Sequence, residues 1–148
     1  MIFRSKMDAY YFKSMIIVVL IIALSSFFPL FIDDIPVAAI LILTLIFLIL
    51  ISFLLWVNVS IRYIFRENYL LIKGGPFRSK IPYESITKVT TTNAIFSGYS
   101  LVTSRDAIEI FSNTTFYGSI KISPYYQSEF MKVLKEKAPH IQIVDFNQ

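Results

Sequence analysis

Two uninterrupted apolar runs near the N-terminus constrain this chain more than any other feature. Residues 15–32 (MIIVVLIIALSSFFPLFI) hold 18 positions without a charge, and residues 37–57 (VAAILILTLIFLILISFLLWV) hold 21 more. A helix needs about 20 such residues to cross the hydrocarbon core of a bilayer. The polar segment DDIP lies between the runs and contains a proline, so a turn is expected there. We therefore predict a hairpin of two transmembrane helices, within a membrane segment of residues 1–57.

The distribution of cations predicts the orientation of this hairpin. The connecting segment has no Lys or Arg, eleven follow residue 57, and three precede the first run: Arg4, Lys6 and Lys13. By the positive-inside rule, this pattern predicts a plasma-membrane protein with both termini in the cytoplasm and Asp33 and Asp34 outside. Cleavage of the first run as a signal peptide, or an inverted hairpin, is the alternative. The second run favours the intact hairpin.

Composition disfavours several classes of function. Cysteine is absent, which excludes disulfides and thiolate chemistry. Neither apolar run contains an ionisable residue, whereas ion and proton pathways normally place such residues within the membrane. Residues 58–148 carry eleven cations and seven carboxylates, a net charge of +4 without a dense basic stripe. This balance suits a domain beside an anionic leaflet better than one that binds nucleic acid.

Beyond residue 60 the chain changes to short segments rich in Tyr, Ile, Val and Thr, which is the composition of strands. Turn signals such as KGGP, SRD and SNTT separate these segments. In AIEIF, Ile108 and Ile110 share one face and Glu109 lies on the other, as in a half-buried strand. We predict an antiparallel sandwich or barrel of about seven strands, at residues 61–66, 69–73, 77–81, 86–92, 99–103, 107–111 and 117–122.

A helical period replaces the strand pattern after residue 122. Ser123 is a good N-cap, Pro124 suits the first helical position, and Pro139 is expected to end the helix. An apolar stripe recurs at helical spacing, which predicts an amphipathic helix packed on the strands: Tyr126, Phe130, Val133, Leu134 and Ala138. Residues 58–148 would thus form one cytoplasmic domain.

Strands closed by one C-terminal helix are the layout of the pleckstrin-homology (PH) fold. The stretches NYLLIKGGPFRSKIPYESITKV, SRDAIEIFSN and IKISPYYQSEFMKVLKEKAPHIQI resemble a largely uncharacterised family of short bacterial membrane proteins with a PH-like domain. The resemblance covers about residues 60–144, and it carries no catalytic residue or cofactor to transfer. A related PH-like immunity protein protects a producer cell from its own bacteriocin. The resemblance therefore implies recognition at the membrane.

The basic hairpin KGGPFRSK supplies the first candidate site, at Lys73, Arg78 and Lys80. If the strand from residue 61 leaves the membrane and the next one returns, the Gly74-Gly75 tip comes back toward the bilayer. There each cation could contribute about 1 kcal/mol of attraction to anionic lipid. The alternative is a structural hairpin in which the glycines supply the turn and the cations are solvated flanks.

A second candidate is the segment KVTTTN, in which Lys88, Thr90 and Thr92 could form an exposed strand edge that receives a peptide. Threonine also suits any strand, which is the structural interpretation. The lone His140 cannot form a metal site and is expected at the surface after the last helix. Gly98-Tyr99-Ser100 lacks the second glycine of a nucleophile elbow and is interpreted as the start of a strand.

Together these observations predict a non-enzymatic recognition or scaffolding protein without a cofactor or metal, held at the inner membrane surface. Its partners would be the lipid bilayer and, in addition, anionic headgroups, a peptide or a membrane protein, but not nucleic acid. Two alternatives are a bacteriocin-immunity protein and an accessory subunit of a larger membrane complex. The sequence sets neither the ligand nor the oligomeric state, because PH-like folds host unrelated functions.

Overall fold

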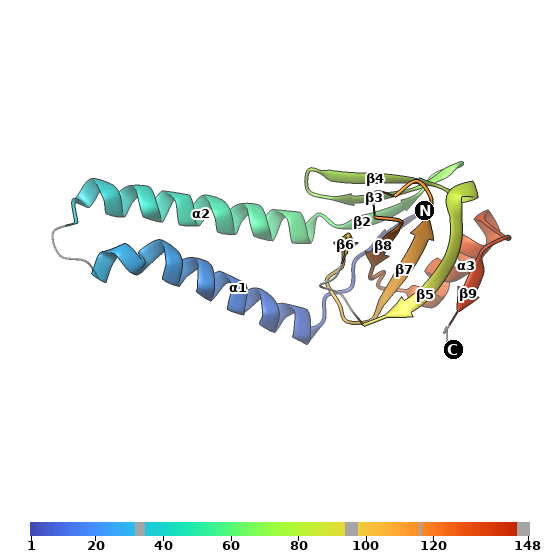
Figure 1. Cartoon of the computed structure of the whole chain (residues 1–148), viewed down its shortest axis with the longest axis horizontal. Helices are drawn as coiled ribbons and strands as arrows, with labels where there is room; N and C mark the ends of the chain where they lie inside the picture. Colours follow the sequence, from blue (N-terminus) through green and yellow to red (C-terminus); the bar gives the residue numbers. More distant parts are fainter. Residues whose placement is uncertain (32–34, 94–97, 116, 145–148) are drawn as a thin grey trace.

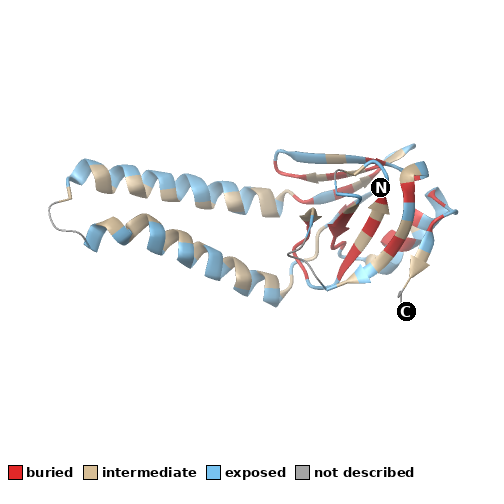
Figure 2. Cartoon of the chain, viewed as in Figure 1, coloured by how far each residue is buried: buried red, intermediate tan, exposed pale blue. Residues whose placement is uncertain are grey.

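A computed structural model describes residues 1–31, 35–93, 98–115 and 117–144. Two long helices, α1 (Ala9–Phe27) and α2 (Val37–Val59), extend together from one end of a two-sheet domain (Figure 1). A 3-10 turn, η1 (Phe28–Phe31), continues α1. Both helical segments are long and apolar enough to cross a membrane, and none of their residues is buried within the chain (Figure 2).

The predicted apolar runs fall largely within these helices, but each helix is longer than predicted at the end nearer the sheet domain. The first begins at Ala9, well before residue 15, because Asp8 supplies an N-cap whose carboxylate accepts from the Tyr11 N–H. The second continues to Val59. Residue 32, the predicted end of the first run, lies outside the described residues.

The first sheet has the strand order β1-β2-β3-β4, and every neighbouring pair is antiparallel. Its strands are β1 (Ile2–Arg4), β2 (Arg62–Phe65), β3 (Tyr69–Gly74) and β4 (Phe77–Pro82). β1 was not predicted; it precedes α1 in the sequence and pairs with β2, which follows α2. The sheet domain therefore includes the N-terminal residues, and the predicted boundary between residues 57 and 58 leaves them out.

The second sheet has the order β6-β8-β7-β5-β9, and η2 (Tyr83–Ser85) connects it to the first. Its strands are β5 (Ile86–Thr92), β6 (Ser100–Leu101), β7 (Ala107–Ser112), β8 (Ser119–Ile122) and β9 (Gln142–Val144). All seven predicted strands are present, in a sandwich of two sheets. The prediction of purely antiparallel pairing was wrong for β6–β8 and β5–β9, which are parallel.

The core lies between the sheets and α3 (Gln127–Lys137). Phe130 is fully buried, and its ring centroid lies 5.3 Å from that of Phe3 and 4.9 Å from that of Phe65. Leu134 and Met131 complete the buried face of α3. Burial of these apolar side chains is the main favourable term that holds the helix on the strands.

The predicted start of this helix needs correction. It begins at Gln127, so Ser123 is not its N-cap, and Tyr126 is 60% exposed instead of buried. Pro124 instead forms an isolated bridge with Ser5, and the Tyr125 N–H donates to the Arg4 carbonyl at 3.0 Å. These contacts with the end of β1 and the residue after it keep residues 124 and 125 extended. Local helix signals in the sequence do not reveal such a tertiary contact.

Candidate functional site

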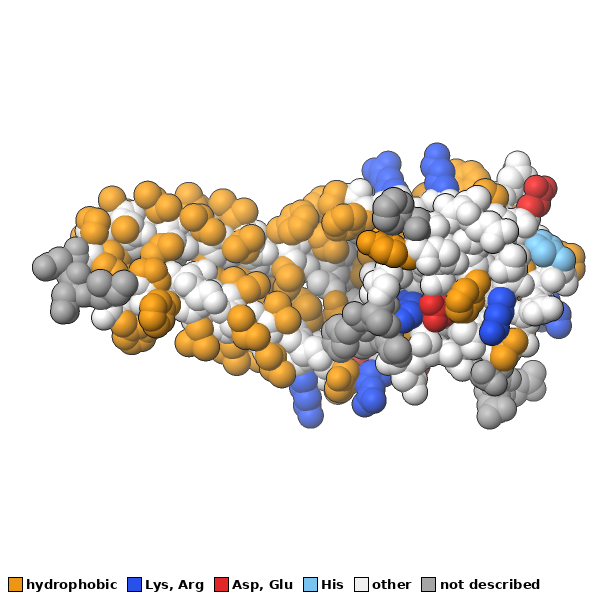
Figure 3. Space-filling view, viewed as in Figure 1, with side chains coloured by type: hydrophobic (Ala, Val, Ile, Leu, Met, Phe, Trp, Pro, Cys, Tyr) orange, Lys and Arg blue, Asp and Glu red, His pale blue; other side chains and the backbone are white. Residues whose placement is uncertain are grey.

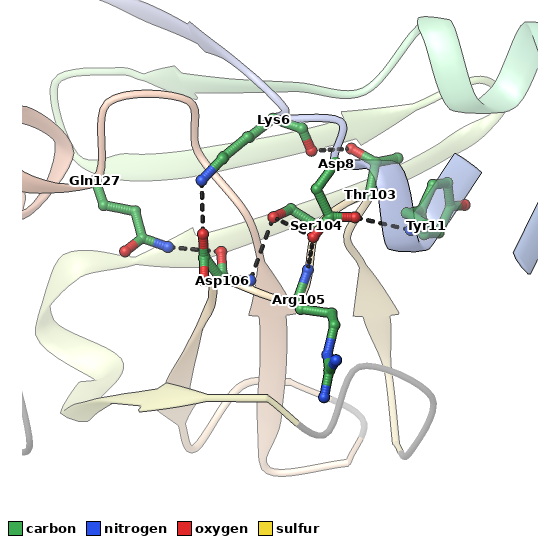
Figure 4. Close-up of polar contacts among 8 residues, drawn as sticks. All are labelled: Lys6, Asp8, Tyr11, Thr103, Ser104, Arg105, Asp106 and Gln127. Carbon is green, nitrogen blue, oxygen red and sulfur yellow. Dashed lines mark hydrogen bonds and ion pairs between the residues drawn. The ribbon is translucent and has the colours of Figure 1, made fainter. Parts of the chain in front are cut away.

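The junction between the helices and the sheet domain carries a dense set of polar contacts. One Asp8 carboxylate oxygen accepts from the Tyr11 N–H at 2.7 Å. The other accepts from the Arg105 N–H at 2.7 Å and from the Ser104 hydroxyl at 3.1 Å (Figure 4). A single side chain thus caps α1 and also binds the loop between β6 and β7.

Neighbouring residues extend this connection. The Lys6 ammonium lies 2.6 Å from the Asp106 carboxylate, and the Thr103 hydroxyl donates to the Lys6 carbonyl at 2.6 Å (Figure 4). The Gln127 side chain donates to the Asp106 carbonyl at 2.6 Å, which ties in the start of α3. We refer to Lys6, Asp8 and residues 103–106 as the α1 clasp.

The electrostatics of the clasp favour an ionised Asp8. Partial burial opposes the charge, but hydrogen bonds from the Arg105 and Tyr11 N–H groups and the Ser104 hydroxyl, with the nearby Lys6 charge, outweigh it. The pKa of the Asp8 carboxyl is therefore lowered from its ordinary value. At neutral pH, Asp8 holds the loop as a carboxylate, whose hydrogen bonds are stronger than those of a neutral acceptor.

The second helix contacts the domain through the tip of the β3–β4 hairpin. Gly75 has a φ of +55°, and a Cβ at this position would lie 2.8 Å from Cγ2 of Val57 in α2. The same tip contains Phe77, which is 50% exposed. The β3–β4 hairpin therefore returns to the end of α2, and Gly75 is required there both for its backbone conformation and for close approach.

The two helices also contact each other where they meet the domain. The Tyr11 hydroxyl of α1 donates to the Asn58 side chain of α2, and the Asn58 amide donates to the Leu54 carbonyl at 2.8 Å. Together with the α1 clasp and the Gly75–Val57 contact, this bond connects both helices and the domain at one end.

A buried group of hydroxyls lies directly behind the clasp. The Tyr63 hydroxyl donates to the Leu101 carbonyl at 2.7 Å and accepts from the Ser123 N–H at 3.1 Å. It also lies 2.9 Å from the Ser5 hydroxyl, which is 2.7 Å from the Thr103 hydroxyl. Burial raises the pKa of Tyr63 to about 12, so its proton remains bound at neutral pH. Ser123 therefore belongs to this buried hydrogen-bond network and does not cap α3.

Four cations stand in register across the first sheet. Arg4 lies opposite Arg62, Arg62 opposite Lys73, and Lys73 opposite Arg78. Directly paired residues in neighbouring strands share a face of the sheet, so all four point the same way. The next register row is Phe3, Tyr63 and Ile72, which is buried, so these four cations occupy the outer face. We refer to Arg4, Arg62, Lys73 and Arg78 as the cation row.

Two of the three predicted hairpin cations belong to this row, and the third does not. Lys80 lies opposite Leu71, one step further along the same face, and its ammonium is 5.7 Å from the centre of the Tyr69 ring. Arg4 and Arg62 were missed as partners, because their alignment depends on β1 and on the register of β2. No local pattern in the sequence contains that register.

The second predicted surface is not an open edge along most of its length. β5 pairs with β7 on one side and with β9 on the other, where Lys88 lies opposite Gln142 and Thr90 opposite Val144. Thr92 pairs with Ala107 of β7. The predicted peptide-binding edge is therefore wrong at Lys88 and Thr90, because the short β9, missed from the sequence, occupies it.

The remaining predicted residues have structural positions. His140 is exposed after α3, as predicted, and its ring nitrogen lies 3.1 Å from the Ile86 carbonyl. Ser100 begins β6, and Gly98 precedes it with a φ of +74°, which agrees with the start of a strand. In the part of the chain that the structure describes, no three His, Asp or Glu side chains gather in a group that could hold a metal ion.

The model of one family, the bacterial PH domain, matches residues 61–138, which include β2 to β8 and α3. The chain belongs to the bacterial PH domain family. It is 32% identical over 143 residues to the uncharacterised protein YyaB of Bacillus subtilis (strain 168), and the match covers 97% of each chain. No solved structure matches the chain significantly.

The two matches cover different parts of the chain: the family model covers the PH domain, and the match to YyaB extends over the N-terminal elements as well. The family match begins at Ile61, so β1 and both apolar helices lie outside it. The match to YyaB covers nearly the whole chain and therefore includes the region of these helices. The sequence similarity to this relative therefore extends beyond the PH domain, over the segment that forms the two helices here. Neither match names an activity, so the implied bacteriocin immunity stays a prediction.

Proposed function

We propose that this bacterial PH domain is a membrane-anchored, non-enzymatic recognition or scaffolding module at the cytoplasmic surface of the plasma membrane. The two helices would cross the bilayer, and the sheet domain would lie against the inner leaflet. Support for the anchor comes from the length, apolar character and exposure of both helices. On the face that Figure 3 shows, most of their side chains are hydrophobic.

The observation that carries the proposal is the double attachment of the domain to its helices. The α1 clasp binds the start of α1 through Asp8, and Gly75 at the tip of the β3–β4 hairpin packs on Val57 near the end of α2. A domain held at two points presents a fixed face to the membrane, unlike one on a flexible linker. This is a geometry suited to binding a partner in, or directly beside, the bilayer.

The cytoplasmic side is favoured by charge and by aromatic side chains. Every Lys and Arg of the chain lies in α1 before residue 15 or in the sheet domain, and the segment between the helices has none. Trp56 lies in the last turns of α2 and is 54% exposed, as expected for a residue at the membrane–water interface. Both features follow the distribution found in inner-membrane proteins.

The orientation is tested with single cysteines, because the chain contains none of its own. Ile35→Cys marks the segment between the helices, and Glu84→Cys marks an exposed residue of the domain. In intact bacterial cells, a membrane-impermeant maleimide should label Ile35→Cys, and Glu84→Cys should react only after permeabilisation. Labelling of Glu84→Cys in intact cells would contradict the proposed side, and recovery of the chain in the soluble fraction would contradict the anchor.

A further inference from the structure

We propose that the cation row binds anionic phospholipid headgroups of the leaflet in which α1 and α2 end. This inference rests on the proposed membrane anchor and names the chemistry that the domain would recognise there. Its basis is the register of the first sheet, which places Arg4, Arg62, Lys73 and Arg78 side by side on one outer face.

The row concentrates positive charge without an internal counter-charge. Neighbouring strands are about 4.8 Å apart, so each cation has a like charge directly opposite, an arrangement that destabilises a sheet. Among the residues that the structure describes, the ion pair is Lys6–Asp106, and no member of the row takes part in one. Arg4, Arg62 and Arg78 are exposed, and Lys73 is half-buried. An external anion would relieve the repulsion that the fold leaves in place.

The row lies at the membrane end of the domain. Arg62 follows the last residues of α2, and Arg4 precedes the Asp8 cap of α1. Lys73 and Arg78 flank the hairpin tip, where Gly75 packs against Val57. Each cation is thus within a few residues of a point where the chain meets a membrane helix, which is the level of the lipid phosphates if the helices span the bilayer.

A cavity at the same place matches the two-part chemistry of a phospholipid. It has a volume of about 380 Å³, and Arg4 and Arg62 line it on the polar side. Met7, Val59 and Ile61 line its apolar side, and Met7 and Val59 are themselves exposed. Guanidinium groups bind phosphate through paired hydrogen bonds, and the apolar wall suits the beginning of an acyl chain.

The test uses Trp56, the only tryptophan of the chain, as a reporter at the membrane end of α2. The full-length protein is reconstituted in phosphatidylcholine vesicles, and its fluorescence is quenched with either brominated phosphatidylglycerol or brominated phosphatidylcholine. Each cation near an anionic surface is worth about a fivefold change in affinity. The wild-type protein should therefore be quenched preferentially by phosphatidylglycerol, and added salt should reduce this preference.

The decisive variant replaces the whole row with Gln (Arg4, Arg62, Lys73 and Arg78). A matched control replaces four cations remote from α1 and α2 with Gln (Arg66 and, in α3, Lys132, Lys135 and Lys137). The row variant should lose the preference for phosphatidylglycerol, whereas the control should retain it. Retention of the preference by the row variant would overturn the proposal. So would an equal loss in both variants, because net charge alone would then explain it.

Two further outcomes separate the row from the anchor and from misfolding. If neither brominated lipid quenches Trp56, the helices are not in the bilayer, and the anchor fails together with the row. If inorganic phosphate abolishes the preference at constant ionic strength, the site takes a soluble phosphate ligand, which contradicts lipid recognition. The row variant should melt at or above the wild-type temperature in an uncharged detergent, since it removes like-charge repulsion. A lower melting temperature there would contradict the account.

Discussion

At the scale of single residues, Asp8 gives the clearest test, because its one carboxylate caps α1 and also accepts hydrogen bonds from Arg105 and Ser104. Asp8→Ala should lower the free energy of unfolding by about 1–2 kcal/mol, whereas Asp8→Asn, a comparable N-cap, should lose less. Thermal unfolding in detergent micelles measures both. Equal losses in the two variants would contradict a capping role.

The charge of Asp8 also predicts a pH dependence. Its pKa is lowered in the folded chain, so its contribution to stability is complete above the unfolded value of about 3.9 and is lost as the pH falls through the folded value. The difference in stability between the wild-type protein and Asp8→Asn should be constant from pH 7 to about pH 5 and should shrink below about pH 4. A difference that does not change with pH would show that the charge is unimportant.

Gly75 and Gly118 form a matched pair for testing contact between the hairpin and α2. Both have positive φ, but a Cβ on Gly118 meets nothing within 4 Å, whereas one on Gly75 would collide with Val57. Gly118→Ala should lower the free energy of unfolding by about 1–2 kcal/mol, which is the cost of a left-handed backbone for a residue with a Cβ. Gly75→Ala should lower it by more, because of the added collision. Adding Val57→Ala should recover part of that excess. Identical melting temperatures for the two alanine variants would contradict the contact.

At the scale of elements, β1 is the strand on which the isolated domain should depend. Phe3 contacts the rings of Phe65 and Phe130 in the core, although it precedes both helices in sequence. A soluble protein of residues 60–148 should therefore be unstable, and joining residues 1–8 to residue 60 through a flexible linker should restore it. Phe3→Ala in the linked protein should cost about 3–5 kcal/mol in urea unfolding. Equal stability of the soluble proteins with and without residues 1–8 would contradict this role.

The same elements explain what the sequence could predict. Continuous apolar runs and alternating segments are local signals, so both long helices, seven strands and α3 were predicted from them. β1 and β9 have three residues each and form only because partners distant in sequence, β2 and β5, are already in place. The cation row shares this dependence. Lys73 and Arg78 were predicted within one hairpin, but Arg4 and Arg62 align with them only through strand register.

At the scale of the whole molecule, three contacts join the two apolar helices to the bacterial PH domain. The Tyr11–Asn58 contact, the α1 clasp and the Gly75–Val57 contact all lie at the same end of the domain. A domain fixed in this way keeps the cation row at a constant height relative to the helix ends. Lipid recognition and anchoring would then act on the same leaflet.

The most direct measurement of this claim is the distance distribution between two spin labels in the reconstituted protein, one on Ile35→Cys and one on Glu84→Cys. These positions lie at the far end of the helices and on the domain. Pulsed electron paramagnetic resonance should give one narrow distribution, which should broaden when Asp8→Ala and Gly75→Ala are combined. A broad distribution in the protein without these two substitutions would show a flexibly tethered domain and would contradict the account.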